Sequence, residues 1–205
     1  MKKYIIIIVL VLSIFQLVAF ATTYTSVYPP AQSDTYVKAP TKNSTSYWAY
    51  FATDPTKTLI GGQASNSWLA DIYSLTNQRF HIDLGSAKII KRIYYENMHS
   101  SGGFTNSGVQ NFTFWGSNTA SAFSELTYAT DTNWTQITTA QSTFDEHTDS
   151  DIADPKYITV TNTTAYRYYG FKFADNYGST FGMGVRRIEL QIEDTGNALF
   201  FGMAF

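Results

Sequence analysis

Hydrophobic and polar residues alternate with a period of two in short runs after residue 22, and Gly, Asn, Asp, Ser and Thr separate these runs. Successive side chains of a strand point to opposite faces of a sheet, so the alternation predicts half-buried antiparallel strands, as in a sandwich or barrel. No amphipathic helix longer than a turn or two is predicted. The strands with the clearest pattern span residues 79–84, 89–97, 109–115, 157–160, 166–173 and 185–193.

The run 79–84 shows the alternation most clearly, because hydrophobic residues stand between Arg79, His81 and Asp83. One face of this strand is expected in the core, and the other is expected to face outward or into the rim of a loop site. Arg79 and His81 are therefore candidates for that rim.

The N-terminal segment 1–21 has a different pattern. Lys2 and Lys3 precede an unbroken hydrophobic run, which closes on the small residues Ala19 and Ala21. A basic start, a hydrophobic middle and a small-x-small end predict a secretory signal peptide. The alternative is a retained membrane anchor, since the run approaches the roughly 17 to 25 residues that span a bilayer. Both interpretations place the rest of the chain outside the cytoplasm, either secreted or on the cell surface.

The rest of the chain is long enough for one domain with a substantial core and short of two. Residues 22–35 are rich in Thr, Ser and Tyr and are expected to lead into a sandwich of residues 36–193. In the tail, residues 194–205, hydrophobic residues alternate up to Phe205. This tail is either a last strand packed on the sandwich or an exposed strand that pairs with another subunit or an export machine.

Composition narrows the classes of function. The chain has 14 basic and 16 acidic residues, so it lacks the basic face that nucleic-acid binding requires. It has no cysteine, which leaves burial of its many aromatic residues, and bound metal, as sources of stability. Catalysis is not expected, because no catalytic motif is present and the three histidines lie far apart in the sequence.

Five groups of motifs follow one another along the chain. They are Arg-Phe-His-Ile-Asp-Leu-Gly at 79–85 with Ala-Lys-Ile-Ile-Lys-Arg-Ile at 87–93, Val-Gln-Asn-Phe-Thr-Phe-Trp-Gly-Ser at 109–117, Asn-Trp-Thr at 133–135, Tyr-Arg-Tyr-Tyr-Gly-Phe-Lys-Phe at 166–173 and Gly-Val-Arg-Arg-Ile-Glu-Leu at 184–190. Together they resemble the discoidin family, also called coagulation factor 5/8 type C domains, over about residues 36–193. The resemblance implies an all-β fold, a jelly-roll β-sandwich of the galactose-binding-like type that carbohydrate-binding modules share.

The resemblance also implies a structural calcium, held in the family by an early Asp, a nearby Thr, main-chain carbonyls and a Glu of the final strand. Asp54, Thr58 and Glu189 match these positions. Calcium takes about six to eight oxygen ligands, which such a turn supplies. The alternative is that Asp54 caps a plain turn with Pro55 and that Glu189 is a surface charge.

A denser acidic run consists of Asp145, Glu146, Asp149, Asp151 and Asp154. Its spacing lacks the Gly and the terminal Glu of an EF-hand loop. We expect a solvated loop here rather than a second metal site.

Three long loops, 61–78, 99–108 and 175–184, combine polar and aromatic residues. The resemblance implies that binding occurs on loops at one end of the sandwich. Aromatic faces with a few polar side chains suit a sugar, and the scarcity of Lys and Arg makes membrane binding the weakest option. The alternative for Trp68 and Phe181 is that they cap the core. The candidate ligand contacts are Trp68, Tyr73, His99, Asn176, Tyr177 and Phe181, with Asn176 and Tyr177 the strongest of them.

Two functions remain at this point. The first is an extracellular module that binds carbohydrate or a glycoprotein through these loops. The second is a structural subunit of a surface fibre, appendage or virion, which assembles with itself through the lead-in 22–35 and the tail 194–205.

Overall fold

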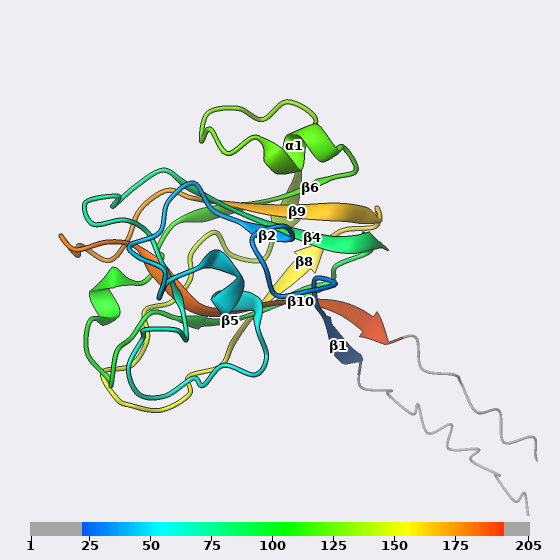
Figure 1. Ribbon diagram of the computed structural model, residues 1–205. Helices are drawn as coiled ribbons and strands as arrows, with labels where there is room; N and C mark the ends of the chain where they lie inside the picture. The colour runs from blue at the N-terminus through cyan, green and yellow to red at the C-terminus, as the bar shows by residue number, and fades with distance from the viewer. Residues whose placement is uncertain (1–21, 195–205) are drawn as a thin grey trace, which may run out of the picture.

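The computed structural model describes residues 22–194, which form a sandwich of two antiparallel β-sheets (Figure 1). The export signal expected in residues 1–21 and nearly all of the expected tail lie outside the described residues. The strands are β1 (Thr23–Val27), β2 (Val37–Lys38), β3 (Trp68–Leu69), β4 (Gln78–Lys88), β5 (Arg92–Asn97), β6 (Phe112–Ser117), β7 (Thr135–Thr139), β8 (Lys156–Thr161), β9 (Tyr166–Phe173) and β10 (Gly184–Asp194). The helical turns are η1 (Ala49–Thr53), η2 (Thr105–Ser107) and α1 (Ala120–Ser124). Within residues 22–194, no helix has both the length and the hydrophobicity needed to cross a bilayer.

Two sheets follow from the strand pairing. One has the order β1-β10-β5-β8, with β3 also paired to β10, and the other has the order β2-β4-β9-β6-β7. A short pairing of β7 with β8 joins them. All six predicted strands are present, and β9 has the predicted bounds. The lead-in also contributes a strand, since β1 pairs along β10 from Thr23 opposite Asp194 to Val27 opposite Leu190.

Aromatic side chains fill the space between the two sheets. Phe80 of β4 and Phe171 and Phe173 of β9 are fully buried, as alternation along these strands requires. Phe144 contacts β9 and stacks on Tyr95 of the opposite sheet with a ring-centroid distance of 4.1 Å, so it bridges the layers. Burying one such side chain stabilises the fold by roughly 1.5 to 3 kcal/mol, which suits a chain without disulfides.

An excursion between β6 and β7, residues 118–134, covers the outer face of the second sheet and carries α1 (Figure 1). His81 is packed there against Trp134, with ring centroids 4.8 Å apart. Gly170 makes this packing possible, because a Cβ at that position would meet both rings at about 3 Å. Arg79 and His81 are therefore fully buried, and the expectation that they face outward or line a rim is wrong.

The buried guanidinium of Arg79 ties this excursion to the sheet. It donates to the main-chain oxygens of Thr127 at 2.9 Å and Tyr128 at 3.2 Å. It also donates to the oxygen of Thr130 and pairs with the carboxylate of Asp131. One side chain thus satisfies several loop carbonyls, which makes it an internal anchor for a long loop.

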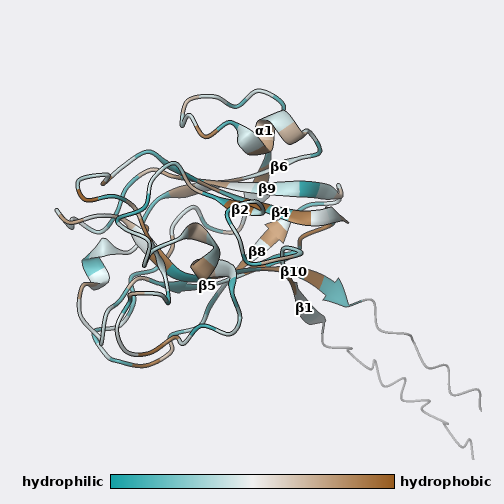
Figure 2. Cartoon of the chain, in the orientation of Figure 1, coloured by the Kyte–Doolittle hydropathy of each residue, from teal (hydrophilic) through white to brown (hydrophobic). Residues whose placement is uncertain are grey.

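Figure 2 shows that hydrophobic residues are not confined to the strands. They also occur in the loops at the left end of the molecule in this view, the end away from β1 and the close of β10. Isolated exposed hydrophobic residues are normal on a protein surface, whereas a cluster of them marks a place of contact. This end of the sandwich therefore carries the loops with features of a contact surface.

Candidate functional site

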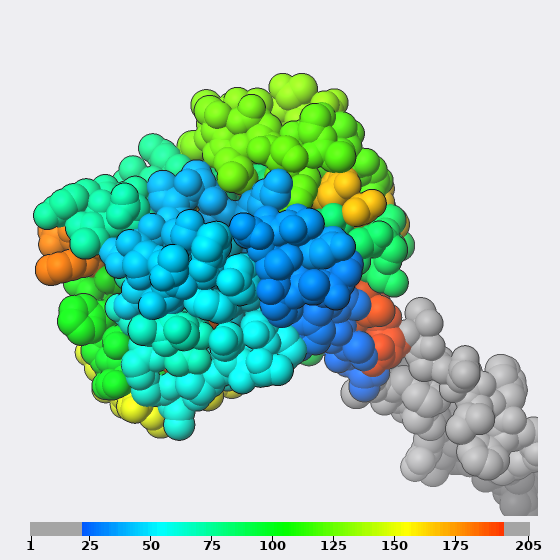
Figure 3. Space-filling model, viewed as in Figure 1, coloured from blue at the N-terminus to red at the C-terminus, as the bar shows by residue number. Residues whose placement is uncertain are grey.

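The three loops 61–78, 99–108 and 175–184 meet at one end of the sandwich. In Figures 1 and 3 the teal, green and orange segments adjoin at the left edge, opposite the first and last described residues. Main-chain bridges hold them together: Gly108 pairs with Gly184, at the start of β10. Rigid strands thus place loops that are far apart in the sequence next to one another.

A cavity of about 270 Å³ lies between these loops, and we call it the loop-end pocket. Its lining contains aromatic, aliphatic and neutral polar side chains and no charged one. This composition suits a neutral ligand with both hydrophobic and hydroxyl groups. The lining residues are Asn43, Tyr47, Gln63, Leu69, Ile72, Phe104, Ser107 and Phe181.

Large hydrophobic side chains around the loop-end pocket are exposed. Phe104 is 62% and Phe181 65% exposed, and Tyr73, next to the lining residue Ile72, is 81% exposed. Exposed rings offer flat faces that pack on the C–H side of a sugar. Tyr73 and Phe181 were both expected as ligand contacts from the sequence, and the structure places them at this end.

Two of these exposed aromatic residues have a strained backbone. Tyr73 has φ 71° and Phe104 has φ 59°, in the left-handed region that bulky residues rarely adopt. Such conformations cost about 1 to 3 kcal/mol and are concentrated at functional sites. The loops thus hold two rings in the solvent at an energetic cost, which a purely structural role does not explain.

Unpaired polar groups line the loop-end pocket. Among the described residues, the side-chain amides of Asn43 and Gln63 and the hydroxyl of Tyr47 form no hydrogen bond with another part of the protein. A few free polar groups among hydrophobic ones give a binding site its specificity. Sequence reasoning missed Asn43 and Tyr47, although an aromatic residue in the Ser-, Thr- and Asn-rich segment 41–48 was a usable signal.

The side chains of Asn176 and Tyr177 hold their own loop in place. The Asn176 amide donates to the main-chain oxygens of Ser179 at 3.2 Å and Gly182 at 2.8 Å. The Tyr177 hydroxyl donates to the main-chain oxygen of Phe144. Both expected contacts therefore point inward and support the loop that carries Phe181 outward.

Trp68 and His99 lie in the interior, away from any ligand. Trp68 is fully buried and its indole N–H donates to the main-chain oxygen of Thr41 at 3.0 Å, so it belongs to the core. His99 stacks on His147 with ring centroids 4.0 Å apart, which brings together two histidines distant in sequence. Burial lowers the pKa of His99, and its Nε2 lies 2.8 Å from the oxygen of Leu59. Neither side chain reaches the loop-end pocket.

The three expected calcium ligands form hydrogen bonds within the protein, and the Thr58 hydroxyl accepts one from the main-chain N–H of Ile60 at 3.3 Å. Asp54 accepts hydrogen bonds from the main-chain N–H of Thr56 at 2.9 Å and from its hydroxyl at 2.7 Å, as a capped turn does. Glu189 accepts from the hydroxyl of Ser26 at 2.6 Å and pairs with Arg187 at 3.1 Å. Within residues 22–194, no three acidic, histidine or cysteine side chains gather as they would around a metal ion.

The main-chain oxygens near Thr58 surround a guanidinium. Arg186, fully buried on β10, donates to the oxygens of Gly61 at 2.8 Å and His99 at 2.9 Å. It also donates to the oxygens of Thr58 and Ile60, each at 3.1 Å. A calcium ion would need such carbonyls as ligands, and a fixed positive charge already holds them. The residues present therefore do not fit a calcium ion.

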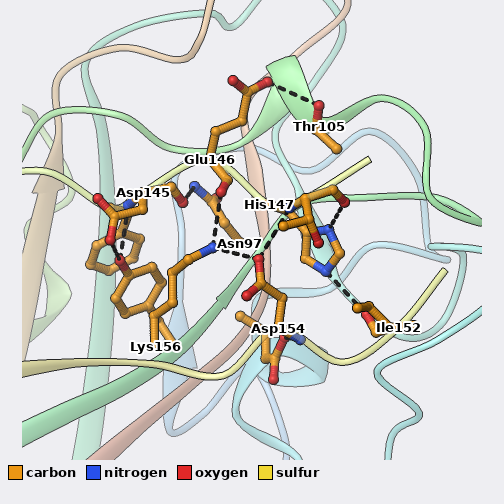
Figure 4. A network of polar contacts seen from close by, with 12 residues as sticks. Asn97, Thr105, Asp145, Glu146, His147, Ile152, Asp154 and Lys156 are labelled. Carbon is orange, nitrogen blue, oxygen red and sulfur yellow. Dashed lines mark hydrogen bonds and ion pairs between the residues drawn. The ribbon is translucent and has the colours of Figure 1, made fainter. Parts of the chain in front are cut away.

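The acidic run 145–154 is solvated as expected, since Asp145, Glu146, Asp149 and Asp151 are exposed, and hydrogen bonds also attach it to the sandwich (Figure 4). Lys156 donates to the main-chain oxygen of Glu146 at 2.9 Å and to Asp154 at 2.5 Å. Asn97, buried on β5, donates to the main-chain oxygen of Asp145 at 3.0 Å. The hydroxyl of Thr105 lies 2.9 Å from the carboxylate of Glu146 and 3.0 Å from that of Asp149, so the run also contacts the 99–108 loop, which carries Phe104.

No protein-family model and no curated protein matches the chain in sequence. Among solved structures, the chain is similar to the family 32 carbohydrate-binding module of NanJ from Clostridium perfringens, solved in complex with galactose. That pair is 13% identical with a TM-score of 0.51, over 83% of this chain and 100% of that one. A family 32 module from the same organism, in complex with GalNAc-β-1,3-galactose, is 14% identical with a TM-score of 0.50, over 75% and 92%. These similarities establish the fold, a galactose-binding-like β-sandwich.

Proposed function

We propose that the protein is a carbohydrate-binding module outside the cytoplasm, which takes a sugar in the loop-end pocket. One observation carries the proposal: exposed Phe104 and Phe181 meet the unpaired amides of Asn43 and Gln63 around one neutral cavity. A sugar ring presents a C–H face to the aromatic side chains and hydroxyl groups to the amides. The pocket offers partners for both.

The comparisons support this proposal at the level of the fold. The two similar modules described above were solved with galactose and with a galactose-containing disaccharide. A sugar with a galactose-like arrangement of hydroxyls is therefore the first ligand to test. The discoidin resemblance and the export signal expected in residues 1–21 favour a sugar that belongs to a glycoprotein or a matrix outside the cell.

A glycan array with immobilised galactose and GalNAc-β-1,3-galactose tests the proposal. We expect retention of the unmodified protein and at least a tenfold loss for Phe181→Ala, which corresponds to about 1.4 kcal/mol. Gln63→Ala is expected to weaken retention without a change in melting temperature, because its amide has no internal partner to lose. Thermal unfolding of each variant separates lost binding from a lost fold.

Tyr157→Ala is the matched control, since Tyr157 is an exposed aromatic residue on strand β8 rather than on the loops. Its retention is expected to equal that of the unmodified protein. If both Phe181→Ala and Gln63→Ala are retained as strongly as the unmodified protein, the sugar does not bind in the loop-end pocket. Absence of retention by any glycan, together with polymers in size-exclusion chromatography, would instead support a self-assembling structural subunit.

A further inference from the structure

A second concavity lies directly beside the loop-end pocket. It has a volume of about 500 Å³ and we call it the side groove. In Figure 3 the blue and light-blue segments that line it lie on the visible face, next to the lime-green 118–134 excursion. The lining residues are Asp34, Val37, Lys38, Ala39, Pro40, Thr41, Lys42, Trp48, Ala49, Asp71 and Leu126.

The two cavities share one wall. Tyr47 lines the loop-end pocket and the next residue, Trp48, lines the side groove. Ile72 of the pocket likewise follows Asp71 of the groove, and Asn43 follows Lys42. Since consecutive Cα atoms are about 3.8 Å apart, these three pairs of residues place the two cavities next to each other.

The side groove differs from the loop-end pocket in its charges. Lys38 and Lys42 face it together with Asp34 and Asp71, and none of the four forms an ion pair within residues 22–194. Instead, the ammonium of Lys38 lies over a phenylalanine ring and that of Lys42 lies 3.8 Å from the ring centre of Trp48. These charged groups remain available to an external partner. Hydrogen bonds to charged groups are stronger than hydrogen bonds between neutral groups.

We propose that the side groove binds the second unit of an oligosaccharide whose first unit occupies the loop-end pocket. Trp48 supplies hydrophobic surface in the groove beside the ammonium of Lys42. Lys38 and Lys42 can donate hydrogen bonds to the hydroxyl groups of a neutral sugar, and Asp34 and Asp71 can accept them. The ligand class is therefore an oligosaccharide of two or more units rather than a free monosaccharide. This inference rests on the proposed function.

The test is a comparison of ligand lengths. Galactose and GalNAc-β-1,3-galactose are titrated by calorimetry against the unmodified protein, Trp48→Ala, Asp34→Asn and Phe181→Ala. The unmodified protein is expected to bind the disaccharide at least tenfold more tightly than galactose. Trp48→Ala and Asp34→Asn are expected to lose most of this gain and to keep their affinity for galactose, while Phe181→Ala loses both ligands.

Asp34→Asn is expected to leave the fold intact, because Asp34 is exposed and its side chain forms no hydrogen bond with another residue in the described part of the chain. A loss of affinity in this variant therefore reports on the groove. Equal affinity for the two ligands would overturn the inference and leave the proposed function standing. A length gain that survives both groove variants would overturn it as well. Failure of the unmodified protein to bind either sugar would instead overturn the proposed function, and with it this extension.

Discussion

The guanidinium of Arg186 donates to the main-chain oxygen of Gly61 over 2.8 Å, across 125 positions of sequence. The same group reaches three further carbonyls, so it joins β10 to two loops at once. Arg79 does the same for the 118–134 excursion. In a chain without cysteine, buried arginines thus perform the loop anchoring that disulfides or metal ions provide elsewhere.

Arg186→Lys is expected to lower the free energy of unfolding by about 3 kcal/mol, measured by urea denaturation. A lysine keeps the charge, yet its single ammonium cannot replace the planar fork, so several carbonyls lose their donor. Arg167→Lys is the control, because the Arg167 pair with Asp83 is partly exposed and its loss is expected to cost clearly less than the loss at Arg186. Equal losses in the two variants would contradict an anchoring role for Arg186.

Calcium is expected to leave the melting temperature unchanged. A ligand that binds only the folded state raises stability with its concentration, so a bound ion would be visible in thermal unfolding. We expect scans with excess chelator and with millimolar calcium to coincide, since Arg186 holds the carbonyls that the ion would need. A clear rise with calcium that chelator reverses would show that Asp54 and Glu189 rearrange around a cation.

Two variants of Phe104 separate the contribution of its ring to sugar binding from the cost of its backbone conformation to stability. Phe104→Gly and Phe104→Ala both remove the ring, so both are expected to lose sugar retention to the same extent. Glycine accepts a positive φ without strain, so the glycine variant is expected to be about 1 kcal/mol more stable than the alanine variant. Urea denaturation and the glycan array measure the two effects. Retention by either variant would remove Phe104 from the site.

The protein is expected to lose stability in acid through His81. Burial lowers the pKa of His81 from its ordinary value of 6.5 to about 4. As pH falls from about 6.5 to about 4, the unfolded chain takes up a proton that the folded protein refuses, so the free energy of unfolding decreases. Below about pH 4, this difference in pKa lowers the free energy of unfolding by about 3 kcal/mol.

His81→Asn should flatten that pH dependence, since an asparagine amide can donate to the oxygen of Phe123 as Nδ1 of His81 can. Urea denaturation at pH 7 and pH 4.5 provides the comparison. The variant is expected to lose less stability on acidification than the unmodified protein. Identical losses in the two proteins would place the acid sensitivity elsewhere, for example at His99, whose pKa is also lowered.

The sequence predicts the strands that alternate and misses those that do not. Six strands follow from hydrophobic alternation, whereas β7 (Thr135–Thr139) is polar apart from Ile137 and gives no such pattern. Strands β2 and β3 contain two residues each, too few for a period to show. Arg79 and His81 were misplaced for a different reason. A polar residue on the outer face of a strand is exposed to solvent only when no other segment covers that face. The 118–134 excursion covers the face that carries Arg79 and His81.

The site could be predicted as a set of loops but not as a set of side chains. A loop has no fixed period, so the sequence does not show that Asn176 and Tyr177 turn inward while Phe181, in the same loop, turns outward. The expected calcium ligands show a similar limit of the sequence. Asp54 and Glu189 match a pattern, but only the structure shows that Arg186 donates to the main-chain oxygens of Thr58 and Ile60 nearby in the sequence.

The position of β10 has a mechanical consequence. The strand begins at Gly184, beside the loops that form the loop-end pocket, and runs to Asp194 at the opposite end, where it pairs with β1. If the proposed site holds a glycan, a pull between that glycan and Thr23 or Asp194, which lie together at the opposite end, would be directed along these strands. Their hydrogen bonds lie across the strands and would carry such a load together in shear, rather than breaking one at a time. On the proposed function, the two strands would therefore resist tension on a bound sugar.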